Sequence, residues 1–470
     1  MLLSRRQTLA LLASAVVAPR RAGGQVGPPA PAAKTKPALP VATTAPIAAA
    51  PSVVAVRGPC DALLAAAIRS PYGWGWAEGE PGIDLTKVRP RGGPPVVDAE
   101  LTAVAGLVLH LAGEAADEPK YLAAAVEAAR AVLAVQARSG QVRARGVMGA
   151  FGGKEDPAEL PDRRPARRGL ALLLTVLDAQ ADQPDPRLKG PAQRVAHWLA
   201  GQQTHIGGWP TLYPPGASKG RGVRLVRLDD PDARDSTLAL LLAGEVLADR
   251  GLRPYVDRAA DHLVTIRLTA GRPPTKALWP AACKLDGDSN TGQLDLPPAV
   301  DLLGTRYAAE ALLAGLLVTF EAGRYDAPLR EARDALSGLP RTAGGGWHRR
   351  YDLQLRPSVP RPDTRPAEGV FTPPPPPPAA LPNPRPAELL ARLARASEVG
   401  GKRLAEEMSA RVPLRRRLAL AASGLAPDAL LLDDPAAGRL PTLVADGEPL
   451  GPSAAIVAEV WRALESPTVR

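Results

Sequence analysis

The chain has 470 residues, of which 45% are hydrophobic, so it is long enough and apolar enough to bury a sizeable core. Its formal net charge of +10 favours an acidic partner, and because no recognition motif accompanies the charge, nucleic acid is excluded as the expected ligand. The two cysteines, Cys60 and Cys283, lack the spacing of a structural zinc site, and whether they pair is left open.

Residues 1–22 have the pattern of an export signal. Arg5 and Arg6 precede an apolar run over residues 9–18, which fits a twin-arginine signal or an ordinary secretory one. The run is too short to span a bilayer, and no later segment is expected to insert stably into a membrane. We therefore predict an exported protein, periplasmic or extracellular. Residues 23–55 are rich in Ala, Pro and Thr and are interpreted as an extended linker.

Residues 56–357 alternate amphipathic helices with loops rich in Gly and Pro. In one such helix Tyr121, Ala125 and Val132 recur at helical spacing on a single face. No sustained strand alternation is found, so we predict an all-α fold in which helix hairpins repeat around an (α/α) toroid. The predicted pairs are 99–111 with 121–136, 168–181 with 191–203, 236–247 with 255–266, and 305–320 with 327–336.

A loop containing Gly or Trp follows the second helix of each pair. The clearest is Gly207-Gly208-Trp209, and similar loops occur at 146–153, 276–279 and 344–347. Repeats spaced by roughly 65 residues suit a helix hairpin with a long loop. Equivalent loops of a ring gather at one end, so we expect a shared rim that could bind an extended ligand.

The chain changes character after the fourth helix pair. Residues 358–386 contain a run of six prolines, which no central helix or strand tolerates, and are interpreted as a linker. Residues 387–470 are predicted to form a small basic helical module with helices at 387–396, 402–422 and 454–464.

Four segments share a pattern with one enzyme family: 72–76 (YGWGW), 207–214 (GGWPTLYP), 276–279 (KALW) and 347–353 (WHRRYDL), the last followed by Arg356-Pro357. Over residues 70–357 the chain thereby resembles the pectate lyases of polysaccharide lyase family 10. The resemblance implies an (α/α) toroid that cleaves polygalacturonate by calcium-assisted β-elimination. An acidic polysaccharide is then the expected partner and calcium the expected cofactor.

The family's chemistry indicates which residue types the site needs. A cation neutralises the uronate carboxylate, the C5 proton becomes more acidic, and a basic side chain removes it. The resemblance assigns that role to arginine, with Arg349 and Arg356 as candidates. A guanidinium acts as a base only if nearby cations and burial depress its pKa. The alternative is that both arginines are surface or carboxylate-binding residues.

Aspartates before the helix at 236 are the acidic candidates. We assign Asp230 and Asp235 to the catalytic site, and Asp229 with Asp286 to the metal, as the resemblance implies. Capping of the helix by these aspartates is an equally good interpretation. The family's His-Asp pair after the third segment is absent, which leaves open a toroid that binds polyuronate without cleaving it.

Aromatic and basic residues near the same loops are candidates for substrate binding. They are Trp209, Tyr213, Lys219, Arg221, Arg224, Trp279 and Trp347. An indole can stack on a sugar face, and a basic loop can bind carboxylates. Packing of Trp209 inside the hairpin, and a solvated loop at 218–224, are the alternatives.

A terpene-cyclase toroid is a third interpretation, because residues 203–209 also fit the Gln and Gly-x-Trp repeat of that class. The acidic protonation motif is missing, and aromatics make up only 4% of the chain, which is too few to line a carbocation cavity.

Overall fold

The structure, a computed structural model, describes residues 53–80, 82–88, 95–148, 162–181, 183–213, 223–268, 275–285, 299–358, 383–410, 412–433 and 451–465. All of these belong to one compact unit, residues 48–470. The export signal, most of both linkers, and Lys219, Arg221 and Asp286 lie outside the described residues.

Four consecutive helix hairpins form the body of this unit, as the sequence predicts. Each pairs an apolar inner helix with a more polar outer one. The inner helices pack on one another in chain order, from α3 to α9, and each outer helix covers its own partner. The hairpins are α3 (Ala99–Ala116) with α4 (Pro119–Ala134), α5 (Arg164–Ala179) with α6 (Pro186–Gly201), α7 (Asp232–Leu247) with α8 (Arg253–Thr265), and α9 (Leu302–Thr319) with α10 (Ala322–Ser337).

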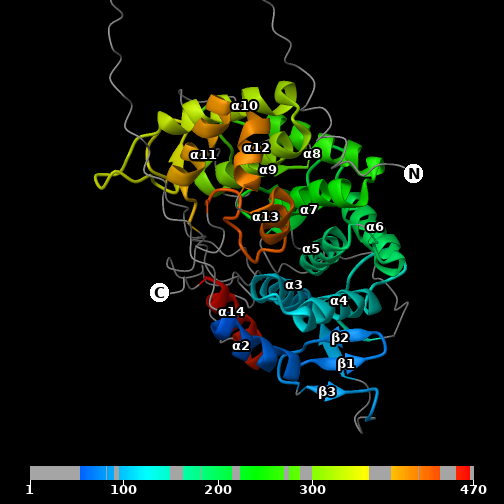
Figure 1. Ribbon diagram of the computed structural model, residues 1–470. Coiled ribbons are helices and arrows are strands. Elements are labelled where there is room, and N and C mark those ends of the chain that lie inside the picture. The colour runs from blue at the N-terminus through cyan, green and yellow to red at the C-terminus, as the bar shows by residue number, and fades with distance from the viewer. Residues whose placement is uncertain are drawn as a thin grey trace, which may run out of the picture. The chain divides into compact units, whose positions relative to one another are not determined.

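Helices from the two ends of the sequence extend this row. α2 (Val53–Ala65) pairs with α14 (Pro452–Glu465), and both pack on α3. At the other end α11 (Pro386–Val399) packs on α10, and α12 (Gly401–Ser409) packs on α9. Figure 1 shows the helices following one another in an arc, from α2 and α14 to α10 and α11, which is the (α/α) toroid arrangement.

The C-terminal helices share a core with the toroid. α13 (Leu414–Ala422) packs on both α5 and α7, and its Leu418 and Ala421 are fully buried. The predicted helix over 402–422 is divided into α12 and α13, because Pro413 lacks the N–H that a continuous helix needs.

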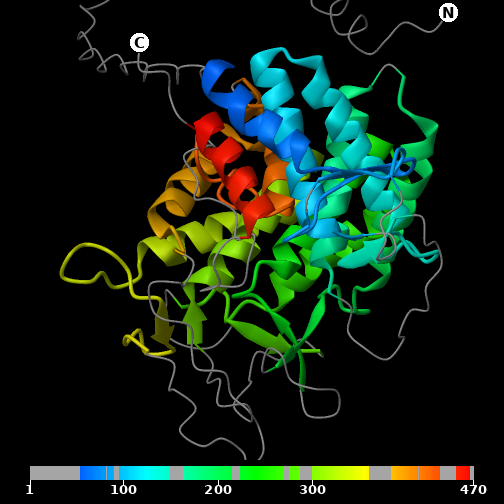
Figure 2. The same ribbon diagram turned by 90° about the horizontal axis from the view of Figure 1, so that it is seen from below.

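Short strands join the hairpins, although the sequence shows no strand alternation. β6 (Pro210–Tyr213), β7 (Val223–Arg227) and β8 (Ala282–Lys284) form one antiparallel sheet. β9 (Ala299–Asp301) pairs with β10 (Arg350–Asp352), and β4 (Val96–Asp98) pairs with β5 (Arg145–Val147) in the same way. β1 (Ile68–Ser70) pairs with β2 (Gly73–Gly75) and with β3 (Ile83–Asp84). Figure 2 shows β6 to β10 gathered at one end of the helices.

An aspartate stands at or just before the start of each inner helix. Asp98, Asp162, Asp230 and Asp301 each accept a backbone N–H of the first helical turn, at 2.9 Å in every case. Such side chains satisfy donors that the helix itself leaves free. Each of these four inner helices therefore starts from the same kind of aspartate cap.

The repeated glycine turn has a steric cause. Gly140, Gly207 and Gly345 end the turns after α4, α6 and α10, each with a positive φ, of +107°, +103° and +78° respectively. A Cβ at Gly207 would lie 2.1 Å from the carbonyl oxygen of Arg258, so a side chain is excluded there.

Helices α3 and α9 are each 18 residues long and apolar enough, by length and composition, to cross a membrane. The sequence alone predicts no membrane-spanning segment after the export signal. In the structure 83% and 89% of their respective residues are buried inside the protein, which is the pattern of core helices.

Candidate functional site

A group of three arginines and two aspartates lies at the start of α9. We call it the arginine cluster. It brings together Arg227 at the end of β7, Arg350 at the start of β10 and Arg349 before it. The aspartates are Asp229 and Asp301.

Asp301 is the anchor of the arginine cluster. Its side chain is fully buried, and one oxygen accepts the N–H groups of Leu303 and Gly304. Nε of Arg350 donates to the other oxygen at 2.6 Å, and Nε of Arg349 lies 3.2 and 3.3 Å from the two oxygens. Pairing of β9 with β10 places Arg350 directly opposite Asp301, so the backbone register fixes this contact.

Asp229 is held between two arginines. Nε of Arg227 donates to Oδ1 at 3.0 Å, and Arg350 approaches Oδ2 at 3.5 Å. Burial raises the pKa of Asp229; Arg227 and Arg350 oppose this rise, and the nearby Asp301 adds to it.

The arginine cluster carries an excess positive charge that solvent can reach. Counting described residues only, three guanidinium groups face two carboxylates, which leaves one positive charge. The side chain of Arg349 is 26% exposed and that of Arg350 is 15% exposed. Among the described residues the terminal nitrogens of Arg349 have no partner, so they are free to bind an incoming carboxylate.

A second group of charges, the central ion network, is buried against the C-terminal segment. Arg234 of α7 and Arg306 of α9 both donate to Glu310, at 2.6 and 2.7 Å. Arg306 also pairs with Asp428, and both arginines donate to the carbonyl oxygen of Pro427. The segment around 427–428 thus seals this side of the inner helices.

The central ion network continues onto α5. Arg163 and Arg167 both pair with Asp232 at the start of α7. Burial lowers the pKa of Arg163 to about 10, so this guanidinium is still charged near neutral pH. Burial also lowers the pKa of Arg167. Both arginines are engaged by the same carboxylate, Asp232, so they hold α5 against the start of α7.

The structure separates the predicted aspartates. Asp230 caps α7 by accepting the N–H of Asp232. Asp235 is 4% exposed and pairs with Arg234 at 2.7 Å, so it belongs to the central ion network. Asp229 is the one predicted aspartate in the arginine cluster among the described residues.

The two predicted arginines also separate. Arg349 belongs to the arginine cluster. Arg356 has a 74% exposed side chain and donates from Nε to Asp352 at 2.7 Å within its own loop. No described contact joins Arg356 to Asp229 or Asp301. Arg356 therefore stabilises a local turn.

The predicted stacking residues need correction. Trp209 and Trp279 are 2% and 0% exposed, and their Nε1 atoms donate at 3.2 and 2.7 Å to carbonyl oxygens of the preceding helices. Their rings close the hairpins and present no face to a sugar. Trp347 is partly buried, with the guanidinium of Arg341 3.3 Å from its ring centre. Arg224 is exposed on β7, and Tyr213 ends β6.

The described carboxylates do not fit a calcium ion. Every oxygen of Asp301 accepts from a backbone N–H or an arginine, and both oxygens of Asp229 face arginines. Calcium needs several free oxygen ligands. Within the described ranges no group of three or more His, Cys, Asp or Glu residues could hold a metal. Asp286, the other predicted ligand, lies outside those ranges.

Sequence reasoning missed Asp301, Arg350 and Arg227. The available signal was an internal repeat of spacing rather than a motif. In each of two repeats a buried tryptophan donates its backbone N–H to a threonine of the next inner helix, and an aspartate precedes that threonine by one turn. The corresponding residues are Trp76, Asp98 and Thr102 in one repeat and Trp279, Asp301 and Thr305 in the other.

Comparison with known proteins gives structural similarity without sequence similarity. No protein-family model and no curated protein matches the chain. Among solved structures, a family 10 polysaccharide lyase from Cellvibrio cellulosa is 13% identical with a TM-score of 0.35, covering 55% of this chain and 83% of its own.

Two further structures are similar at the same level. A cellobiose 2-epimerase from Spirochaeta thermophila is 14% identical with a TM-score of 0.38, covering 67% of this chain and 81% of its own. A beta-1,3-1,4-glucanase from a Paenibacillus species is 10% identical with a TM-score of 0.39, covering 88% and 91%. At these TM-scores none of the similarities assigns a substrate or a reaction to this chain.

Proposed function

We propose that this protein is an exported carbohydrate-binding toroid that holds an acidic polysaccharide, such as polygalacturonate, at the arginine cluster. The observation that carries the proposal is the anchoring of two adjacent arginines, Arg349 and Arg350, on one fully buried carboxylate, Asp301. A buried acid with no free oxygen serves to orient these guanidinium groups. Asp301 has no oxygen left for a metal ion.

The geometry suits recognition of a carboxylate. Because its Nε is fixed on Asp301, Arg349 keeps two terminal nitrogens for a uronate, which a guanidinium can bind in a bidentate manner. Arg224, which is exposed on β7 and close to Arg227 in the sequence, supplies a further positive charge. The excess charge also attracts a polyanion from solution.

Binding without cleavage is favoured over lyase activity. Arg349 is bound through Nε to Asp301, and Asp235 is locked in the central ion network. A general base must be free to take the substrate proton, and both of these residues are engaged in ion pairs. The chain therefore keeps the anion-binding half of the predicted site, whereas the predicted catalytic residues Arg349 and Asp235 both have ion-pair partners.

Retention on immobilised polygalacturonate at low salt tests the proposal, with a neutral galactan as the comparison. We expect retention on the acidic polymer alone, and no absorbance from unsaturated product, with or without calcium. Formation of unsaturated product would establish the lyase alternative. If the protein passes through both columns, the polyuronate proposal fails.

A further inference from the structure

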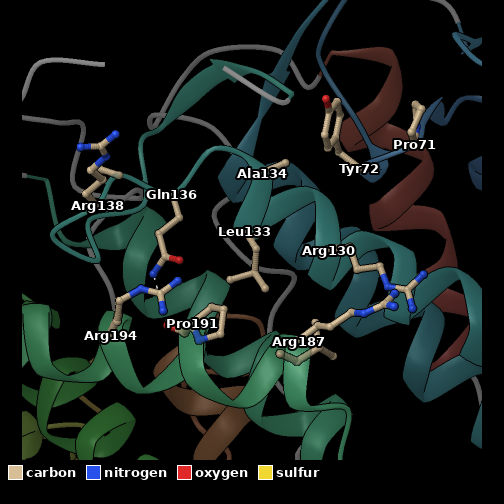
Figure 3. Close-up of a pocket in the computed structure, with 12 residues that line it drawn as sticks. Pro71, Tyr72, Arg130, Leu133, Ala134, Gln136, Arg138, Arg187, Pro191 and Arg194 are labelled. Carbon is tan, nitrogen blue, oxygen red and sulfur yellow. Dashed lines mark hydrogen bonds between the residues drawn. The ribbon is translucent and has the colours of Figure 1, made fainter. Parts of the chain in front are cut away.

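A cavity of about 520 Å³ lies on the outer side of the ring, between α4, α6 and the turn that joins β1 to β2. Its volume is within the range of small-ligand pockets. Figure 3 shows Pro71 and Tyr72 on the β1–β2 turn at one side of the pocket, with Arg130 and Leu133 of α4 below them. None of its lining residues belongs to the arginine cluster or the central ion network.

The walls of this pocket carry four arginines: Arg130, Arg138, Arg187 and Arg194. Arg130 pairs with Glu127 at 2.6 Å and with Asp185 at 3.6 Å. The other three make no ion pair with any described residue. Among the described residues the two carboxylates, Glu127 and Asp185, balance two of the four arginine charges. Two positive charges therefore remain around the cavity, and an anion would neutralise them.

The arrangement of the arginines indicates more than one anionic group. Arg187 and Arg194 are both on α6, seven residues apart, and so stand roughly 10 Å apart along the helix. Figure 3 shows Arg187 extending toward Arg130, with Arg194 beside Gln136 at the other end of the pocket. A single small anion cannot contact both ends. Nε of Arg130 is moreover a buried donor without a partner among the described residues.

The surface between the two ends is apolar. The partly buried side chains of Leu133 and Pro191 contribute to it, and Tyr72, which is 46% exposed, also lines the pocket. The CH-rich face of a sugar ring packs well on such a surface and on a tyrosine ring. Carboxylates at intervals along an apolar body are the chemistry of a uronic-acid oligosaccharide.

We infer that this pocket is a second binding site of the protein, specific for a short oligouronide. Carboxylates of separate sugar units pair with Arg187 and Arg194, while the intervening ring lies on Pro191 and Leu133. This inference rests on the proposed function for its ligand class, but it concerns different helices and different arginines. Two sites on one ring would let a long acidic chain bind with added avidity.

The test is protection of arginines from phenylglyoxal, read residue by residue by mass spectrometry on the full chain. Trigalacturonate is the probe, with neutral galactotriose and inorganic tripolyphosphate as comparisons. We expect trigalacturonate to slow modification of Arg187 and Arg194 several-fold, and the two comparisons to protect much less. Unchanged rates with trigalacturonate would overturn the inference. Equal protection by tripolyphosphate would overturn the oligouronide assignment, because charge alone would then explain binding.

Protection of Arg349 in the same spectra reports the proposed function separately. Protection of Arg349 alone would contradict ligand binding at the pocket and support binding at the arginine cluster. Protection of Arg187 and Arg194 alone would support the pocket and contradict the arginine cluster. In titrations, R187A/R194A should weaken binding at the pocket about tenfold or more, since two charge-assisted contacts are lost. R330A, which removes a 54% exposed arginine of α10, should leave both sites unchanged.

Discussion

Asp98 and Asp301 occupy the same position in two repeats of the ring. Each ends a short strand, accepts at least one backbone N–H of the next inner helix, and lies opposite an arginine on the paired strand. At Asp98 that arginine, Arg145, is 3.9 Å away and largely exposed. At Asp301 it is Arg350 at 2.6 Å, and Arg349 joins it. The same structural unit thus forms a helix cap in one repeat and, in the other, a cap that also holds the two adjacent arginines of the arginine cluster.

The two arginines that resemble family residues should behave differently on substitution. R349A is expected to weaken retention on polygalacturonate several-fold, because it removes the most accessible donors of the arginine cluster. R356A should change retention little, since its guanidinium is engaged by Asp352 in a separate loop. Affinity chromatography at low salt compares them. Equal loss in both variants would show that overall charge, and not the arginine cluster, determines binding.

Removal of divalent cations should not weaken binding. The oxygens of Asp229 and Asp301 are already engaged by arginines, so the ligand is held without a bridging metal. Retention measured with a chelator should match retention with added calcium. Raising the salt concentration should release the protein in both buffers, because exposed charges are screened. A requirement for calcium would place a metal site outside the described residues.

Glu310 should be essential for stability. It is fully buried and is the shared acceptor of Arg234 and Arg306. E310Q leaves two buried cations poorly compensated, and a loss of about 3 kcal/mol or more in the free energy of unfolding is expected. Urea denaturation measures it. The control is E331Q, which breaks the ion pair between Arg267 and Glu331. Because the Glu331 side chain is 57% exposed, this substitution should cost less than about 1 kcal/mol.

His262 should make the protein less stable in mild acid. Burial lowers the pKa of its imidazole to about 4, and its Nε2 lies 4.0 Å from the buried Sγ of Cys283. Above pH 6.5 the ring is neutral in both folded and unfolded chains and contributes no pH dependence. Below that value the unfolded chain binds a proton that the folded one excludes. Stability therefore falls as the pH drops from 6.5 toward 4, by about 3 kcal/mol at most.

Comparison with H262Q isolates this effect. The variant should lose less stability over the same pH range than the parent protein does, as judged by urea midpoints at each pH. Parallel curves for the two proteins would mean that carboxylates, and not His262, determine the acid sensitivity.

The glycine turns offer a matched pair of substitutions. G207A should be strongly destabilising, because its Cβ would lie 2.1 Å from a backbone oxygen and its φ of +103° is strained for alanine. At Gly345 the φ is also positive, at +78°, but no atom lies within 4 Å of the added Cβ. G345A should therefore cost only the backbone strain, about 1 kcal/mol. Thermal melts that rank the variants the other way would contradict the packing argument.

The helix hairpins could be predicted because their apolar periodicity is strong, and all eight predicted helices are present. The inner helices α5, α7 and α9 begin three or four residues earlier than predicted. Their first turns contain buried charges, such as Arg167 and Asp235, which an apolar stripe does not reveal. Their neighbours Arg168 and Arg234 donate to Ser423 and Pro427 of the C-terminal segment, and contacts so remote in sequence have no local signature.

The candidate site was predictable only in part. Arg349 was found because its neighbours in sequence resemble a family motif. Its partner Asp301 is 48 residues earlier in the chain and meets it through strand pairing. For Trp209 the Gly-Gly-Trp pattern is equally compatible with an exposed indole and a buried one. The hydrogen bond to Leu199, a tertiary contact, makes it structural.

The pairing of α2 with α14 has a consequence for biosynthesis. Val56, Cys60 and Leu63 of α2 are buried in the finished structure, and Glu78 accepts the N–H of Ala454 at the start of α14 at 2.7 Å. The contacts between α2 and α14 form only after α14 has left the ribosome. Until then α2 packs on α3 without α14, and the face of α2 that α14 covers stays open. A chaperone would have that apolar face to hold while the intervening hairpins are being made.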